Sequence, residues 1–160
     1  MMNQLPLYLS NNFIEWGQKE GADITPLKLQ KLLYLYYARY CYTQKARPFE
    51  DCFVNWKLGP VLVNVYETTK RFGAGALTPL HEIDGSVIRI SASSEPFQQI
   101  FNEVVTHYGH KTASELVNIT HHGLPDKKYQ TAWEKAGGET DLGNWISAKD
   151  AQEDGRRLFE

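Results

Sequence analysis

The chain has 160 residues, of which 42% are hydrophobic and 12% aromatic, and this composition excludes an intrinsically disordered protein. The formal net charge of −2 gives no electrostatic reason to expect nucleic-acid binding. The charge is uneven, however, because residues 1–80 hold nine cationic and six acidic side chains, whereas residues 81–160 hold eight and thirteen. Such a dipole can orient a protein partner.

Two cysteines, Cys41 and Cys52, fit a reducing cytosol, and residues 1–10 lack the basic and apolar regions of a signal peptide. We therefore expect a cytoplasmic protein whose two thiols are buried as small apolar side chains. A Cys41–Cys52 bridge is conceivable across the intervening loop, but the sequence does not establish it.

The segment from Thr25 to Tyr42 predicts the central helix of the fold. Thr25 suits the N-cap and Pro26 the first helical position. Apolar side chains follow on nearly every face, which is typical of a helix buried in a bundle. Charged residues interrupt the run, so it falls short of the roughly 20 apolar residues of a membrane span. We expect the interrupting cations Lys28, Lys31 and Arg39 to snorkel or to pair with acids of the C-terminal half.

Helical spacing, capping residues and glycine or proline boundaries predict further helices on both sides of the central one. These are a first helix to about Lys19, a third from Pro60 to Phe72, a fourth from Ser94 to Tyr108, a fifth from Thr112 to about Ile119, a sixth from Pro125 to Trp133 and a last one after Ser147. Gly155 should weaken the last helix. Residues 81–91 predict a small β-hairpin around the turn dipeptide Asp84-Gly85.

The predicted fold class is therefore mainly α (α+β): a single-domain bundle of about six to seven helices around the central helix, with a small β-hairpin. The domain should span residues 1–160, with its core motifs in residues 5–136 and a C-terminal extension in residues 137–160.

The sequence shows no spacing that is typical of a catalytic, metal or cofactor site. No CxxC, HxxxH or HExxH pattern is present, and neither is a glycine-rich nucleotide loop. Cys41 or Cys52 could in principle meet His121 as a Cys-His pair, but the local sequence has no nucleophile signature. We therefore expect no metal, no cofactor and no enzymatic activity.

The segment Asn55–Pro60 combines an aromatic residue, a cation and a Gly-Pro pair. One interpretation is architectural: Trp56 fills a gap in the core, and Gly59 supplies an unusual backbone angle. Lys57 fits that interpretation less well, because a buried lysine needs a carboxylate partner, for which Glu67 and Glu115 are candidates.

Three segments together resemble the Panacea, or SocA-like, antitoxin domain, which is also described as phage-associated and GepA-like. They are LKLQKLLYLYYARY (Leu27–Tyr40), WKLGPVLVNVY (Trp56–Tyr66) and ASELVNITHHGLPDKKYQTAW (Ala113–Trp133). The resemblance covers about residues 5–136. It implies a protein that neutralises a toxin by direct binding and is encoded beside that toxin on mobile elements or prophages.

On this resemblance, the predicted function is that of an antitoxin whose partner is a cognate cytoplasmic protein toxin, with no nucleic acid or membrane as partner. The predicted partner-binding residues are Trp56, Lys57, Tyr66, Thr120 and His121. Each of them has a structural interpretation as well. Two functional alternatives remain open at this point: a prophage-associated interaction module without a toxin, and a small hydrolytic enzyme that uses the helical pocket.

Overall fold

The computed structural model describes residues 5–139 and 143–160, and in this part of the chain it contains seven α-helices and two short hairpins. Residues 1–4 of the predicted domain and residues 140–142 of its C-terminal extension lie outside the described part. The α-helices are α1 (Leu5–Glu20), α2 (Pro26–Gln44), α3 (Val63–Thr69), α4 (Phe97–Tyr108), α5 (Ala113–His122), α6 (Ala132–Lys135) and α7 (Ala148–Arg157), and a 3₁₀ helix η2 (Lys70–Phe72) follows α3. The mainly helical fold class is confirmed. Among the described residues, no helix combines the length and apolar character needed to cross a bilayer.

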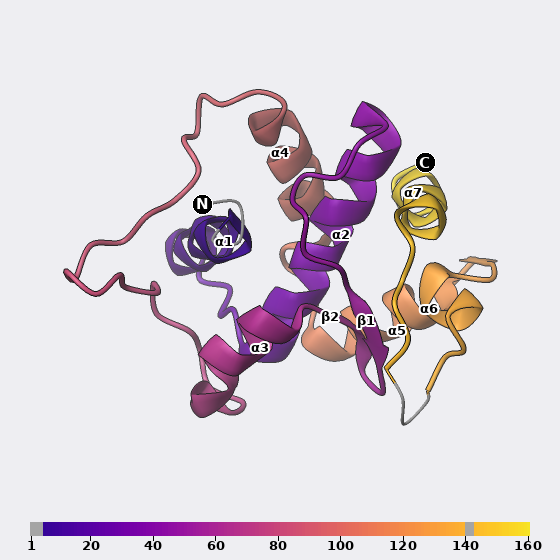
Figure 1. Ribbon diagram of the computed structural model, residues 1–160, viewed down its shortest axis with the longest axis horizontal. Coiled ribbons are helices and arrows are strands. Elements are labelled where there is room, and N and C mark those ends of the chain that lie inside the picture. The colour runs from indigo at the N-terminus through magenta and orange to yellow at the C-terminus, as the bar shows by residue number, and fades with distance from the viewer. Residues whose placement is uncertain (1–4, 140–142) are drawn as a thin grey trace.

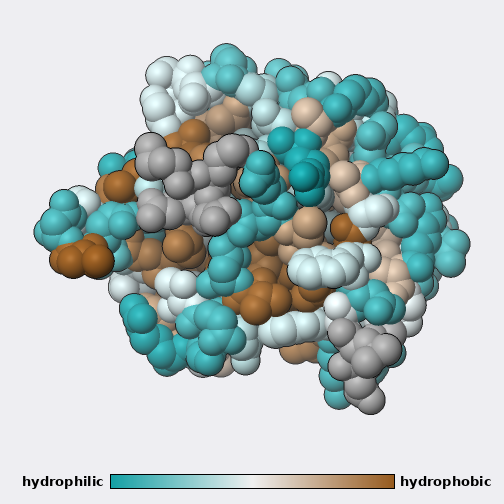
Figure 2. Space-filling view, viewed as in Figure 1, coloured by the Kyte–Doolittle hydropathy of each residue, from teal (hydrophilic) through white to brown (hydrophobic). Residues whose placement is uncertain are grey.

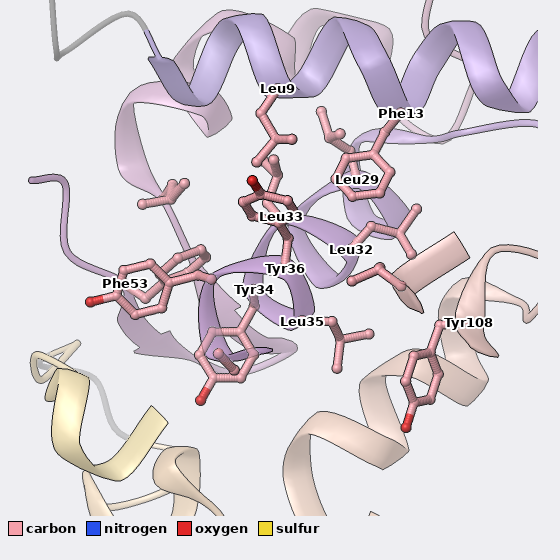
Figure 3. Packing of buried hydrophobic residues seen from close by; sticks show 14 of the residues in the cluster. Leu9, Phe13, Leu29, Leu32, Leu33, Tyr34, Leu35, Tyr36, Phe53 and Tyr108 are labelled. Atoms are coloured by element: carbon pink, nitrogen blue, oxygen red, sulfur yellow. The ribbon is translucent and has the colours of Figure 1, made fainter. Parts of the chain in front are cut away.

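Helix α2 is the centre of the fold, as the sequence predicts, and α1, α4, α5 and α7 all pack against it (Figure 1). The Thr25 side chain accepts a hydrogen bond from the Lys28 backbone N–H at 3.2 Å, and Pro26 occupies the first turn. Burial is almost complete around the helix, since Leu29, Leu33 and Tyr34 are each 0% exposed. Figure 3 shows side chains of α1 pointing into this cluster.

The β-hairpin lies in a different part of the chain from the one predicted. Strands β1 (Val54–Trp56) and β2 (Gly59–Val61) pair antiparallel, with Asn55 opposite Pro60. Pro60 therefore belongs to a strand, and α3 begins at Val63 instead of at Pro60. Proline fits a strand as well as a first helical turn when its position needs no N–H donor.

Residues 81–91 contain a turn but no strand, so the prediction of a hairpin in this segment is wrong. The turn is closed by the Gly85 N–H, which donates to the Glu82 carbonyl at 2.9 Å. The amide side chains of Asn11 and Asn12 make hydrogen bonds with the backbone on either side of this turn, at Leu80, Ile88 and Ile90. These hydrogen bonds take the place of pairing between two strands and hold the long loop beside α1 (Figure 1).

A second hairpin replaces the start of the predicted sixth helix. Strands β3 (Gly123–Leu124) and β4 (Lys127–Lys128) pair around Pro125, and α6 begins only at Ala132. Its start carries a complete capping box, in which Thr131 and Glu134 satisfy each other's backbone N–H groups. The capping box predicted at Thr112 for α5 is confirmed.

Helix α7 packs closely along α2, and Gly155 is the residue that allows this contact. A Cβ at Gly155 would lie 2.0 Å from the Ala38 carbonyl oxygen, so a side chain there would push the helices apart. The neighbouring Asp154 is 1% exposed. It accepts hydrogen bonds from the hydroxyls of Tyr34 and Tyr129, the latter at 2.6 Å. The glycine that should weaken α7 as an isolated helix is therefore required for its packing.

Two of the three cations of α2, Arg39 and Lys31, find different kinds of partner. Arg39 pairs with Glu103 at 2.7 Å and with Glu160 at 2.9 Å, as predicted for an acid-rich C-terminal half. Lys31 is 0% exposed and bonds to a backbone carbonyl instead, which contradicts the prediction for this residue.

Cys41 is buried and Cys52 half-buried, and both are free thiols.

Candidate functional site

The β1–β2 hairpin presents the segment that the sequence singles out. Its turn consists of Lys57 and Leu58, both exposed, and Gly59 follows with a φ of +113°. A Cβ at Gly59 would lie 2.8 Å from Lys31 Nζ and 3.0 Å from Thr120 Oγ1. Glycine is therefore required here twice, for the backbone angle and for the close approach to the helices beneath.

Polar side chains from two helices hold the hairpin in place. Lys31 Nζ donates to the Pro60 carbonyl at 2.7 Å. The Gln30 side chain donates to the Leu62 carbonyl at 3.0 Å and accepts from its N–H at 2.9 Å. From α6, Trp133 Nε1 donates to the Trp56 carbonyl at 2.8 Å. The backbone of the hairpin is thus fixed from within the protein on both strands.

Lys31 is the residue of this site that sequence reasoning missed. Burial lowers the pKa of its amine from 10.5 to about 7. A signal was present in the sequence, because Lys31 lies between Gln30 and Leu32 in a helix that is apolar on almost every face. A lysine in the middle of such a helix has no solvent to reach and must find a buried acceptor.

Thr120 and His121 lie behind the hairpin, at the end of α5. Thr120 is 0% exposed, and its hydroxyl donates to the Leu116 carbonyl at 3.0 Å. The His121 ring stacks on Trp133 with 3.6 Å between ring centroids and 11° between planes. Burial, followed by the nearby charges of Lys31 and His122, lowers the pKa of His121 to about 4. Its imidazole is therefore neutral at physiological pH.

The outer face of the hairpin forms one wall of a groove of about 570 Å³. Helix α2 contributes its first turn, and α3 and η2 form the other side; the lining includes Leu27, Trp56, Lys57, Leu58, Val61, Tyr66 and Lys70. Trp56 and Tyr66 meet edge to face at 5.0 Å. Figure 2 shows a brown, hydrophobic area near the centre of one face of the molecule, bordered by hydrophilic residues.

The structure thus divides the five predicted site residues into two groups. Trp56, Lys57 and Tyr66 line the groove, whereas Thr120 and His121 support the hairpin from the opposite side. Lys57 is exposed, so it needs no carboxylate partner of the kind that a buried lysine would require.

The groove offers apolar area and cations more than catalytic groups. In residues 5–139 and 143–160, no group of three or more His, Cys, Asp and Glu side chains is placed to hold a metal ion. Burial raises the pKa of the Cys41 thiol to about 11, so this thiol stays protonated at neutral pH. An exposed apolar surface rimmed by polar residues is typical of a protein interaction site.

Comparison with curated proteins and with solved structures gives no match. A family model, described as "Antitoxin SocA-like, Panacea domain", matches residues 29–124. The match runs from α2, through the hairpin and its groove, to the end of β3, and it covers more than half of the chain. The chain therefore belongs to the family of SocA-like antitoxins with a Panacea domain.

Proposed function

We propose that this protein is the antitoxin of a toxin–antitoxin system and that it neutralises a cognate cytoplasmic protein toxin by direct binding. The observation that carries the proposal is the family match over residues 29–124. That region holds most of the buried helix α2 and the hairpin fixed on it, so the matched residues include both the scaffold and most of the lining of the groove.

The proposed contact surface is the groove between the hairpin and α3. Trp56, Lys57 and Tyr66 would meet the toxin there, because their side chains line the groove. Thr120 and His121 would act indirectly by keeping the hairpin in position, since they lie beneath it. Aromatic side chains at the centre of a surface with a polar rim are typical of residues that dominate binding free energy.

No catalytic step is part of this proposal. The neutral imidazole of His121 is stacked flat on Trp133, and the Cys41 thiol is buried in α2 with a raised pKa. Neutralisation then needs no cofactor and depends on the affinity and lifetime of the complex.

Co-expression with the product of the neighbouring gene tests the proposal. The neighbour should arrest growth when it is expressed alone, and growth should return when this chain is expressed with it. The two proteins should also co-purify as a defined complex. A neighbour that is harmless alone would refute the antitoxin function and favour an interaction module without a toxin.

A further inference from the structure

Two exposed apolar side chains line the groove, and a third lies one helical turn before one of them on α3. Leu58 at the hairpin turn is 48% exposed, Val63 at the start of α3 is 41% exposed, and Tyr66 one turn later is 38% exposed. Large apolar side chains scattered singly on a surface need no explanation, but a contiguous group beside a groove indicates a binding surface. The groove therefore has an apolar floor and apolar edges to which a partner's side chains could pack.

The hairpin cannot extend its sheet by pairing with a strand of a partner. On the free side of β2, Pro60 has no N–H, its carbonyl is taken by Lys31, and both backbone groups of Leu62 are taken by Gln30. On the outer side of β1, residues 144–146 already pair with the strand. A partner must therefore fill the groove with side chains, as an amphipathic helix does when it lays its apolar face into a groove.

The charges at the groove are complementary to an acidic partner. Its lining includes Lys57 and Lys70 and no carboxylate. Lys70 pairs with Glu67 at 2.6 Å, whereas Lys57 makes no ion pair with any described residue. Arg71 follows Lys70 on η2 and is also exposed. Cations beside an apolar groove favour carboxylates that flank the apolar stripe of the partner.

We propose that the groove binds an acidic amphipathic α-helix of a protein partner, with apolar side chains seated against Trp56, Leu58 and Tyr66 and carboxylates facing Lys57 and Lys70. The identification of that partner as the toxin rests on the proposed function, but the chemistry of the groove does not. The proposal specifies the kind of toxin segment that this antitoxin would mask.

Three synthetic peptides test the groove directly against the full-length chain by calorimetry. The first is an Ala-based helix with Leu at positions i, i+4 and i+7 and Glu beside them; the second replaces each Glu with Lys; the third is the acidic peptide with a central proline that breaks the helix. The acidic helix should bind most tightly, and its affinity should fall as salt rises. Equal binding of the acidic and basic helices, no binding of the acidic helix, or equal binding of the proline peptide would overturn the proposal.

Variants locate the binding site. Leu58→Ser should weaken binding of the acidic helix by about tenfold, because burial of a leucine is lost. Lys57→Glu should weaken it by about two- to fivefold and should improve binding of the basic helix. Lys128→Glu, an exposed change on β4 away from this groove, is the matched control and should have no effect. Unchanged affinity in Leu58→Ser, or a dimer of the chain that depends on Leu58, would overturn the proposal, the latter by making a second copy the occupant.

The same variants separate this inference from the proposed function in cells. If the neighbouring gene product is toxic and Leu58→Ser and Lys57→Glu still restore growth as the unchanged chain does, the antitoxin function stands and the toxin is not the partner that the groove binds. If the neighbour is harmless, the antitoxin function fails, and the peptide experiment alone decides on the groove. Thermal melts of each variant should match that of the unchanged chain, since both altered side chains are exposed.

Discussion

Replacement of Lys31 by methionine should stabilise the protein at pH 7 and weaken the dependence of its stability on pH. The pKa of the buried amine is about 7 in the folded chain, whereas the ordinary value of 10.5 applies to the unfolded chain. At pH 7 this difference costs the folded state about 4 kcal/mol, at roughly 1.4 kcal/mol per pH unit. Methionine removes that cost but leaves the Pro60 carbonyl without its donor, a loss of about 1–3 kcal/mol. The expected net gain at pH 7 is therefore about 1–3 kcal/mol.

The sign of the pH effect follows from which state holds more protons. Between pH 7 and pH 9 the amine of the unfolded chain remains protonated, whereas the amine of the folded chain loses its proton over this range. Stability of the unchanged protein should therefore rise with pH in this range, by about 2 kcal/mol from this group. Lys31→Met lacks the titrating group. The difference in the free energy of unfolding between this variant and the unchanged protein should therefore decrease by about 2 kcal/mol between pH 7 and pH 9.

Urea unfolding followed by circular dichroism at pH 7, 8 and 9 measures this difference. The exposed Lys19 on α1 provides the control, because Lys19→Met removes a lysine without a buried environment and should change stability little at any of the three pH values. Measurements should stop at pH 9, since the Cys41 thiol, with its pKa raised to about 11, introduces an opposite dependence above that. A constant difference between Lys31→Met and the unchanged protein from pH 7 to pH 9 would refute the assignment of a largely neutral, buried Lys31.

Three further changes have expected outcomes that urea or thermal unfolding can check. Gly155→Ala should destabilise the protein by about 1–3 kcal/mol through the clash with the Ala38 carbonyl, although alanine favours an isolated helix by about 1 kcal/mol; a stabilised variant would contradict the close packing of α7 on α2. Burial raises the pKa of the Asp154 carboxyl from 3.8 to about 6, so the folded chain keeps this proton to higher pH than the unfolded chain does. The stability of the unchanged protein should therefore fall as the pH rises from about 4 to about 6, and Asp154→Asn should remove that fall. A variant whose stability falls over this range as that of the unchanged protein does would contradict this assignment. Gly59→Ala should cost about 2 kcal/mol, because φ is +113° and the added Cβ meets Lys31 Nζ; an unchanged melting temperature would contradict the strain.

The sequence predicts those parts of the fold that local signals determine. Thr25 and Pro26 mark the start of α2, and Thr112 with Glu115 marks the start of α5, because capping is a property of a few adjacent residues. The sequence does not decide whether Pro60 begins a helix or lies in a strand, since proline suits both. Long-range contacts in the folded structure determine that Pro60 lies in a strand.

The groove shows the same division between local and long-range information. Its aromatic and cationic side chains can be recognised from the motif around Trp56. The burial of Thr120 and the stacking of His121 on Trp133 cannot, because they depend on the packing of α5 against α6 behind the hairpin. Gly155 is a second example. Its cost to an isolated helix is visible in the sequence, whereas the approach of α7 to Ala38 that requires it is a property of the packed structure.

The central helix therefore has a role beyond supplying apolar area. Gln30 and Lys31 are two of its buried polar residues, and together they bond to Pro60 and Leu62, the positions at which the chain leaves the hairpin for α3. An apolar residue at Lys31 would give a more stable core but would leave the carbonyl of Pro60 without a donor. A buried polar group retained at such a cost can specify one conformation among several. We infer that Lys31 fixes the angle of the hairpin and thereby the shape of the groove, so Lys31→Met should stabilise the fold and at the same time weaken binding of an acidic helix.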